Sequence, residues 1–359
     1  MFPSFVVGGA QARFCAAANR HGAVLRHAIV SMDGNLSCRE RLRSDLDVVC
    51  PAVVIRRGDT LGNLRRFRAV LGDLRPDVLL THNFGAIEWA LANLLPGARA
   101  RHVHVEDGFG PEEQDRQLPR RVLLRRLALR RATVALPSRV LLRIAQTIWR
   151  IDKRRLRYVP NGVDLSQFSP ARADGDAPWR LPGAGPIVGT VAGLRPEKNV
   201  ARLVRAVARV PGLRLVVIGD GPDRAALAAL AAELGIGARV ALVGHLDDPA
   251  AAYAHMDLFA LSSDTEQMPL SVLEAMATGL PIASTDVGDV AAMVSEVNRP
   301  FVVPRDDRAL AEALSRLAAD PVQARAIGAA NRVKAAAEYD QAQMFAAWGE
   351  LLGATGRSA

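Results

Sequence analysis

The sequence predicts an α/β protein built from two Rossmann-like, doubly wound domains that face a cleft. Its 359 residues correspond to about two domains at roughly 150 residues each. Hydrophobic residues make up 50% of the chain and charged residues 23%, a balance typical of packed globular domains and not of a disordered scaffold. Short β-branched runs alternate with longer Ala- and Leu-rich stretches, which is the pattern of parallel sheets covered by helices.

In the first half, the expected strands are apolar runs that end at polar or glycine-bearing loops. They cover residues 53–55, 78–82, 100–105 and 134–137, with helices expected at 9–21, 61–74 and 84–95. The run that precedes Gly8 and Gly9 is so brief that any first strand there must be very short. In an open parallel sheet, the loops after the strands form the edge at which ligands bind.

The second half repeats this alternation with clearer strands. Strands are expected at 187–192, 213–219, 240–244, 258–262, 281–284 and 301–303, and helices at 199–210, 222–234, 249–255, 270–278 and 307–317. Between the halves lies a segment rich in Pro, Gly, Asp and Ser. We therefore expect an acceptor-side domain at 1–163, a linker at 164–185, a donor domain at 186–338 and a last helix within 339–359 that crosses back to the first domain.

Cysteine content and hydropathy indicate the compartment. The three cysteines, Cys15, Cys38 and Cys50, are an odd number without metal-ligand spacing, which favours a reducing environment over a disulfide framework. No apolar run reaches the roughly 18 to 20 residues of a membrane span, and the first residues lack a signal-peptide pattern. We expect a cytoplasmic protein.

Positive charge is concentrated in one segment. The net charge is +9, and residues 116–157 alone contain fourteen Lys and Arg against one acid, Asp152. This predicts peripheral contact with an anionic membrane at its inner face, or with a lipid-linked acceptor. The alternative is an arginine-rich solvated surface, because the arginine pairs between 120 and 131 spread around a helix. Nucleic acid is disfavoured, since aromatics make up 5% of the chain and none interleaves these arginines before Trp149.

The strongest candidate site follows the expected strand at 258–262. A polar loop leads to Pro269, a residue suited to the first turn of a helix. Unpaired backbone N–H groups at Met268 and Leu270 would then face the strand ends and favour an anion such as phosphate.

Two glutamates flank this helix start. Glu266 lies in the loop and Glu274 about two turns into the helix, a separation that suits ligands with several hydroxyl groups. Taken as an isolated pair, they are as readily explained by a helix-stabilising acid and a solvated one.

A second constellation joins a glycine turn to two cations. Arg195 and Lys198 follow Gly193, and a guanidinium with an ammonium could neutralise a diphosphate without a metal ion. No Asp-x-Asp follows an expected strand, so no metal site is predicted. A solvated helix start is the alternative for this segment.

Two glycine motifs are weaker. Gly8 and Gly9, followed by Gln11, precede an expected helix and would let the backbone approach a phosphate or acceptor. The segment 217–222 resembles a dinucleotide-binding motif but has Arg224 where a third glycine would stand, so we interpret it as a strand-to-helix turn.

In order, these segments resemble the retaining, nucleotide-sugar-dependent glycosyltransferases of GT-B architecture (group 1, E-x7-E motif). The resemblance rests on segments 8–11, 159–164, 193–198, 217–222 and 243–245 and on Glu266 with Glu274. It covers most of the chain, densely from 158 to about 303. Gln267 departs from the pattern, since many relatives have glycine there.

The resemblance implies a role for each matching residue. Arg195 and Lys198, with the amides at Met268 and Leu270, would bind the donor diphosphate. Glu274 would hold the ribose and Glu266 the donor sugar, while the backbone near His245 and Leu246 would line the base. Gly9 would close onto the diphosphate from the other domain. No cofactor is implied besides the donor, a UDP- or GDP-sugar.

The first domain supplies the candidates for the face near the sugar. The resemblance implies a histidine on a first-domain loop, and the segment 102–110 offers His104, Glu106 and Asp107. The predicted activity is metal-independent transfer of a hexose to a glycan or lipid-linked acceptor of the cell envelope. The alternatives are a non-hydrolysing sugar-nucleotide epimerase and an inactive, sugar-binding partner subunit.

Overall fold

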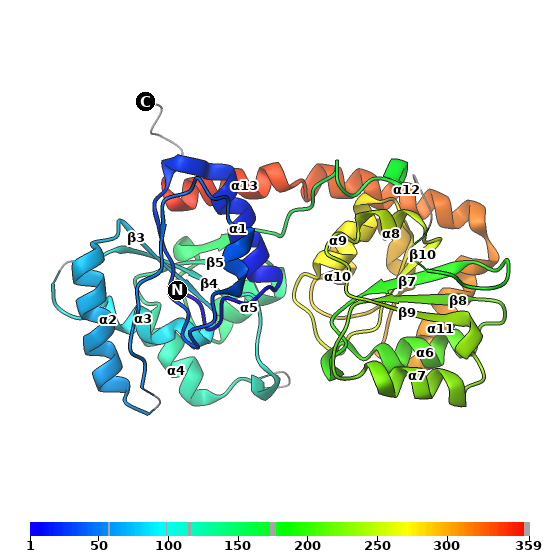
Figure 1. The fold of residues 1–359 in the computed structure, drawn as a ribbon, viewed down its shortest axis with the longest axis horizontal. Coiled ribbons are helices and arrows are strands. Elements are labelled where there is room, and N and C mark those ends of the chain that lie inside the picture. Colours follow the sequence, from blue (N-terminus) through cyan, green and yellow to red (C-terminus); the bar gives the residue numbers. More distant parts are fainter. Residues whose placement is uncertain (57, 98, 114–115, 173–176, 178, 355–359) are drawn as a thin grey trace. The chain divides into compact units, whose positions relative to one another are not determined.

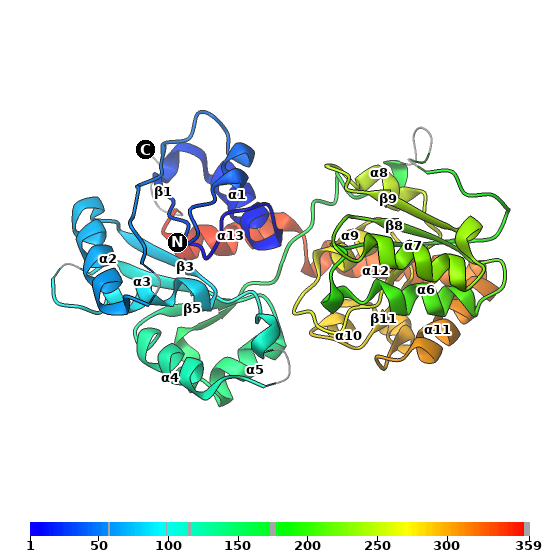
Figure 2. The same cartoon turned by 60° about the horizontal axis from the view of Figure 1, so that its bottom comes forward.

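The computed structural model describes residues 1–56, 58–97, 99–113, 116–172, 177 and 179–354 (Figure 1, Figure 2). They form two compact units, one of Met1–Pro160 with Met344–Ala359 and the other of Asn161–Gln343. The chain thus changes units ahead of the segment in which the sequence predicts the linker. Parts of that segment, and the last five residues of the predicted final helix, lie outside the described residues.

The second unit is built on a six-stranded parallel sheet in the order β12-β11-β10-β7-β8-β9. Its strands are β7 (Ile187–Val191), β8 (Arg214–Ile218), β9 (Val240–Gly244), β10 (Leu258–Leu261), β11 (Ile282–Thr285) and β12 (Val302–Val303). Each lies within one or two residues of its predicted bounds, which confirms the strand assignments for this half. The order reverses between β7 and β10, and doubly wound sheets bind ligands where the order reverses.

Helices cover both faces of this sheet (Figure 2). They are α6 (Val200–Ala208), α7 (Arg224–Glu233), α8 (Ala250–Ala254), α9 (Leu270–Ala277), α10 (Val290–Met293), α11 (Asp307–Ala319) and α12 (Pro321–Glu338). Helices α6, α7 and α11 pack in one apolar cluster, and α8, α9 and α10 in the other. Helix α12 reaches both clusters; the sequence analysis did not predict it, because its alanines leave little apolar periodicity.

The first unit contains a four-stranded parallel sheet, β3-β4-β5-β6, and a separate parallel pair, β1 with β2. The strands are β1 (His27–Ala28), β2 (Val48–Val49), β3 (Val78–His82), β4 (Arg101–Val105), β5 (Thr133–Leu136) and β6 (Leu156–Tyr158). The strand predicted at 53–55 is wrong. Val53 and Ile55 pack against an apolar cluster. The alternation of apolar and polar residues there therefore comes from burial of one side of the segment, and these residues are not part of a sheet.

The helices of this unit also lie on both faces of its sheet (Figure 1). They are α1 (Gly9–His21), α2 (Thr60–Leu74), α3 (Ile87–Ala92), α4 (Pro119–Ala128), α5 (Arg139–Thr147) and α13 (Gln341–Leu352). Met344 and Trp348 of α13 pack against Val103, Val105 and Ala135 of β4 and β5. Among the described residues, no helix combines the length and apolarity that crossing a bilayer requires.

Candidate functional site

Two loops at the point where the strand order reverses in the second unit are joined by hydrogen bonds. The loop after β7 carries Lys198, and the loop after β10 carries Glu266. The Ser262 hydroxyl donates to the Lys198 carbonyl at 3.2 Å, and the Asp264 amide donates to the Glu197 carbonyl at 2.9 Å. The fold thereby unites the two constellations that the sequence analysis identified separately.

Lys198 and Glu266 form an ion pair at the centre of this arrangement. Lys198 Nζ lies 2.7 Å from Glu266 Oε1, and the Ser263 hydroxyl donates to the same oxygen at 2.8 Å. Their side chains are 20% and 12% exposed, so the pair is largely shielded but open at one side. The ammonium and carboxylate expected to serve the phosphate and the sugar are therefore direct neighbours.

A buried arginine that the sequence analysis missed supports these loops. Arg202 donates to the Ser262 carbonyl at 2.8 Å and lies 2.8 Å from an Asp264 carboxylate oxygen. Asn199 caps α6 and donates to Asp264 at 3.0 Å. A capping asparagine directly after Lys198, with an arginine three residues further on, is the sequence signal that could have indicated this support.

Arg195 occupies a more open position. It precedes a short 3-10 turn, Pro196–Lys198, and its guanidinium lies 3.0 Å from a Glu197 carboxylate oxygen. The side chain is 59% exposed. A phosphate bound by Arg195 would therefore compete with Glu197 for this cation.

Helix α9 begins beside Glu266. Pro269 is its N-cap, and the Pro269 carbonyl accepts the amides of Val272 and Leu273. The Leu270 amide lies in the first turn, where no intrahelical acceptor exists. Met268 is buried and its carbonyl accepts the side-chain amide of Asn161 at 2.8 Å, which fixes the approach to the helix.

Glu274 lies in the second turn of α9 and bonds to a tyrosine. Its carboxylate accepts the Tyr253 hydroxyl at 2.6 Å. Burial raises the pKa of Glu274 to about 7; the Tyr253 hydrogen bond opposes this rise and the charge of Asp248 adds to it. Burial likewise raises the pKa of Tyr253. Near neutral pH, Glu274 can therefore lose or keep its proton in response to a ligand.

Glycines allow the site loops to pack closely. A Cβ on Gly288, whose φ is +55°, would lie 2.5 Å from the carbonyl oxygens of Glu266 and Gln267. Gly219 has φ +129°, and a Cβ there would lie 1.9 Å from the Ala192 carbonyl oxygen. A Cβ on Gly193, in contrast, would have as its nearest neighbour the Arg195 side chain at 3.7 Å, which is an ordinary contact distance. The turn at 219–221 thus packs against the loop that leads to Arg195. This agrees with its interpretation as a strand-to-helix turn and not as a dinucleotide-binding motif.

The residues expected near the base follow β9. His245 is 64% exposed, with Nε2 3.5 Å from an Asp247 oxygen. Leu246 is half-buried and packs against the apolar cluster of α8 and α9. Because β9 is parallel to β7 and β10, both residues lie at the sheet edge that carries Lys198 and Glu266.

In the first unit, the glycine pair begins helix α1. Gly8 is the N-cap and Gly9 the first helical residue. Gln11 donates from its side chain to the Ser4 carbonyl at 2.8 Å, which fixes the preceding turn. Their contact with a diphosphate stays a prediction.

His104 and Glu106 lie in the interior of the first unit. His104 is 0% exposed, and its Nδ1 is hydrogen-bonded to Thr81 Oγ1 at 2.8 Å. Glu106 accepts the guanidinium of buried Arg125 at 3.1 Å. As folded, these two side chains face other side chains and not solvent, and Asp107, at 17% exposure, is the most accessible of the three candidates.

Asp107 is part of a cluster that the sequence analysis did not assemble. It pairs with Arg13 of α1, and His82 Nδ1 lies 3.8 Å from its second oxygen. Burial opposes ionisation, yet Arg13 and His82 hold the pKa of Asp107 well below its usual range. Burial also lowers the pKa of His82 to about 4. The position of His82 at the end of a predicted strand was the signal for it.

The basic segment 116–157 divides into buried and exposed arginines. Arg125 is 1% exposed, pairs with Glu106 and Glu113, and lies over the rings of Phe84, Phe109 and Trp149. It therefore belongs to the core, which corrects its assignment to a solvated or membrane-facing surface. The exposed side of α4 instead combines Arg120 and Arg126 with Leu123 and Leu127.

Metal-ligating side chains are dispersed. Among the residues that the structure describes, no three His, Cys, Asp or Glu side chains group closely enough to hold a metal ion.

Two doubly wound units with a site where the strand order of the second reverses define the GT-B architecture, and solved structures share it. The crystal structure of HepE from Anabaena in complex with UDP-glucose matches with a TM-score of 0.77 at 20% identity, covering 98% of this chain and 97% of that chain. The family model described as Glycosyl transferases group 1 matches residues 185–320, and the one described as Glycosyltransferase Family 4 matches residues 24–167. The solved structure shows the GT-B architecture of the fold, and each family model matches less than half of the chain.

The curated relatives that this chain resembles are glycosyltransferases. A GDP-mannose-dependent alpha-mannosyltransferase of Mycobacterium tuberculosis is 36% identical over 152 residues, which are 42% of this chain and 39% of that protein. A D-inositol 3-phosphate glycosyltransferase of Nocardia farcinica is 31% identical over 247 residues, 64% of this chain and 54% of that protein. The chain spans about half the length of these curated relatives.

Proposed function

We propose that this protein is a retaining, metal-independent glycosyltransferase. It transfers a hexose from a UDP- or GDP-sugar to a glycan or lipid-linked acceptor of the cell envelope. The observation that carries the proposal is the shielded Lys198–Glu266 pair where the strand order of the second unit's sheet reverses. The use of GDP-mannose by a curated relative supports a nucleotide-sugar donor.

The donor diphosphate is held by cations and amides of the second unit. Lys198 approaches one phosphate, Arg195 leaves Glu197 for another, and the first turn of α9 directs its free N–H groups at the same place. These positive groups stabilise the charge that develops as the bond from the sugar C1 to the diphosphate oxygen breaks.

The two glutamates act on opposite ends of the donor. Glu274, in its ionised form, accepts hydrogen bonds from the ribose hydroxyls, and Tyr253 orients it. Glu266 lies against the sugar and favours its oxocarbenium character. The acceptor hydroxyl forms the new bond to C1 on the leaving-group face, and its proton passes to a phosphate oxygen of the departing diphosphate.

The test compares two lysines. Lys198→Ala should weaken donor binding and transfer by roughly 1 to 3 kcal/mol, because a charge-assisted bond is lost. Lys334→Ala removes a lysine that pairs with Glu338 at the surface of α12, and should leave both unchanged. Thermal stabilisation by a panel of UDP- and GDP-sugars gives binding, and sugar transfer gives activity.

Glu274→Ala provides the second arm and should weaken donor binding by a similar amount. Equal donor affinity and transfer in the wild type and both site variants would overturn the assignment of the site. Release of a free epimer of the donor sugar, with no transfer, would favour epimerase activity instead.

A peripheral membrane role accompanies the proposed activity, with the protein in the cytoplasm at the inner face of the membrane. The exposed side of α4 places Leu123 (65% exposed) and Leu127 (47%) beside exposed Arg120 and Arg126, a combination suited to an anionic bilayer surface. Vesicle binding should rise with anionic lipid and fall with salt. Equal binding to neutral vesicles, or no loss in Leu123→Ser/Leu127→Ser, would count against it.

A further inference from the structure

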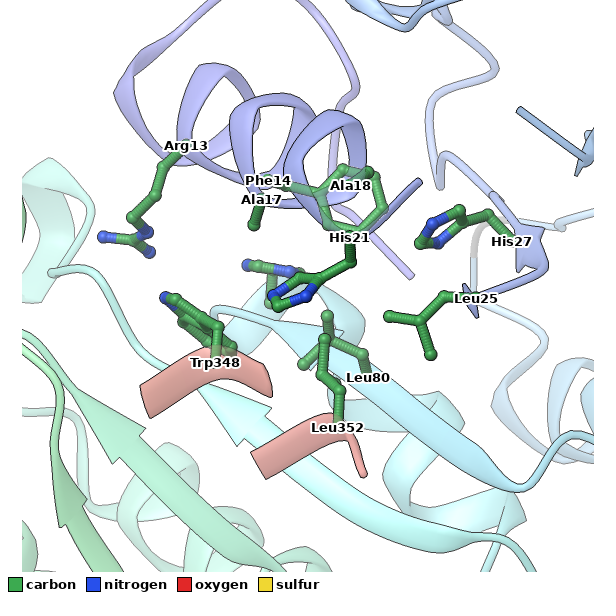
Figure 3. Close-up of a pocket in the computed structure, with 11 residues that line it drawn as sticks. Arg13, Phe14, Ala17, Ala18, His21, Leu25, His27, Leu80, Trp348 and Leu352 are labelled. Carbon is green, nitrogen blue, oxygen red and sulfur yellow. The ribbon is translucent and has the colours of Figure 1, made fainter. Parts of the chain in front are cut away.

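A cavity in the first unit is too small to hold a nucleotide sugar (Figure 3). It is lined mainly by α1 and α13, with Leu80 and His82 of β3, and its volume of about 20 Å³ gives room for about one water molecule. A donor would instead bind at the open loops around Lys198 and Glu266. The shape of those loops depends on the contacts behind the ion pair.

Asp264 joins the loop that carries Glu266 to the loop that carries Lys198. Its amide donates to the Glu197 carbonyl at 2.9 Å. One of its carboxylate oxygens accepts the side-chain amide of Asn199 at 3.0 Å. Asp264 therefore bonds to the residue on either side of Lys198, and it stands two positions before Glu266 in its own loop.

The backbone of Asn199 makes its contact with Asp264 important. Its φ is +40° and its ψ is +49°, in the left-handed region, which asparagine enters more readily than most residues. At this point the chain turns from the Lys198 loop into α6. The Asn199 side-chain oxygen accepts the Arg202 amide at 3.2 Å, while its nitrogen donates to Asp264. The direction in which the chain leaves Lys198 therefore depends on Asp264.

Arg202 fixes Asp264 from inside α6. Its guanidinium lies 2.8 Å from the other Asp264 carboxylate oxygen and donates to the Ser262 carbonyl at 2.8 Å. Its Nε lies 3.5 Å from an oxygen of Asp307, the first residue of α11. The Arg202 side chain is 10% exposed, so little water competes for these contacts. Arg202 thus ties the Glu266 loop to two helices.

The planar guanidinium suits this place better than an ammonium would. It lies between a carbonyl oxygen and a carboxylate oxygen, and its N–H groups have fixed directions. A lysine at 202 would keep the charge and lose that geometry.

We propose that Arg202 and Asp264 are positioning residues for the Lys198–Glu266 pair. They act through Asn199 and through the backbone of the two loops, and they set the distance between the ammonium and the carboxylate. The effect on the ion pair is independent of any substrate. The consequence for sugar transfer rests on the proposed function.

The first experiment observes the lysines of the whole chain without a ligand. The chain has three, Lys153, Lys198 and Lys334, so labelling lysine with 13C at Cε gives three signals that can be told apart by NMR. The signal that is lost in Lys198→Ala belongs to Lys198. Glu266→Gln then gives the position of that signal without the ion pair. In Arg202→Met, the Lys198 signal should move at least half of the way to that position.

Two variants make this result specific. Arg205→Met removes a guanidinium one turn further along α6, whose partner is Asp307, and should leave the Lys198 signal in place. Arg202→Lys should move the signal less than Arg202→Met does. An unmoved Lys198 signal in Arg202→Met, or an equal shift in Arg205→Met, would overturn the proposal.

Asp264→Asn tests the same contact with less disturbance, because the Asp264 side chain is 29% exposed and the substitution keeps its size. It should also move the Lys198 signal toward the position in Glu266→Gln. Hydrogen exchange of the β7 and β10 amides shows for each variant that the sheet stays folded. A folded Asp264→Asn variant with an unmoved Lys198 signal would contradict the role of Asp264.

The second experiment measures turnover of the UDP- or GDP-sugar that stabilises the wild type. In Arg202→Met, kcat should fall about tenfold while donor affinity changes less than threefold, because a displaced Glu266 affects the transition state more than the bound donor. A moved Lys198 signal with unchanged kcat would overturn the link to transfer. Unchanged donor affinity and turnover in Lys198→Ala would instead overturn the proposed function, and the lysine signals would still decide the role of Arg202.

Discussion

Both units are built on parallel sheets, but different contacts stabilise their interiors. The second packs apolar side chains on both faces of a sheet whose central strand, β7, is complete. The first buries ions beside β4: Arg125 with Glu106 and Glu113, and Arg13 with Asp107. Burial of ions stabilises a fold only while every partner is in place, whereas an apolar core tolerates local change. The first unit should therefore be the more vulnerable to loss of one charge.

The largest expected effect comes from breaking the ion cluster of the first unit. Arg125→Met removes the cation that buried Glu106 and Glu113 share, leaving Glu113 with Arg121, and should cost about 3 to 5 kcal/mol. Hydrogen exchange of the β4 and β5 amides measures the loss in this unit. Hydrogen exchange of the β7 and β10 amides reports whether the second unit stays folded.

The neighbouring arginine is the control. Arg126 is exposed and donates to the Ile148 carbonyl at 2.6 Å, so Arg126→Met leaves no buried charge unpaired and should cost about 1 kcal/mol. Adding Glu106→Leu and Glu113→Leu to Arg125→Met should recover part of the loss, since no charge is then left unpaired. Equal exchange in Arg125→Met and Arg126→Met would contradict the role of the cluster.

The contrast also explains what the sequence could predict. In the second unit, the loops after β7 and β10 contain residue types suited to an anion and a sugar, so Lys198 and Glu266 could be named as candidates before their contact was known. In the first unit, partners such as Thr81 and His104 lie on different strands and meet through register. No local sequence pattern predicts such a pairing. Only the burial of His104, which the structure shows, distinguishes it from Asp107 as a candidate for contact with a sugar.

The accuracy of the predicted strand bounds also differs between the two units. Runs that are apolar because both faces are buried, such as β10, were located to within a residue. The pair β1–β2 has two residues in each strand and offers too little periodicity to be found. Arg202 was missed because a charged residue inside a helix does not by itself indicate burial, and only the capping Asn199 before it pointed to this support.

A smaller effect should come from one glycine in each unit. Gly288→Ala places a methyl group against two backbone carbonyls at positive φ and should cost about 1 to 3 kcal/mol, with weaker donor binding as the Glu266 loop shifts. At Gly8 the φ is extended, and the nearest atom to a Cβ is the flexible end of Gln11, at 2.9 Å. Gly8→Ala should therefore change the free energy of unfolding by less than about 0.5 kcal/mol. Urea unfolding of each unit measures the loss of free energy of unfolding. Equal losses in Gly288→Ala and Gly8→Ala would show that the close contact at Gly288 does not hold the Glu266 loop in place.

The smallest effect is a difference in the sign of the pH response. The pKa of Glu274 is raised from 4.5 to about 7, so between these values the folded second unit binds a proton that the unfolded chain has released. Its stability should fall as pH rises through this window. The pKa of His82 is lowered from 6.5 to about 4, so between these values the unfolded chain binds the extra proton. The stability of the first unit should rise with pH there.

Hydrogen exchange at pH 4.5, 5.5 and 6.5, corrected for the intrinsic rates, resolves the two responses unit by unit. Glu274→Gln should flatten the decline in the second unit and leave the first unchanged. His82→Gln should reduce the rise in the first unit alone, and the remainder should come from His102, whose pKa burial lowers to about 3. Slopes of the same sign in both units, with neither variant altering its own unit, would mean that these two buried groups do not set the pH dependence.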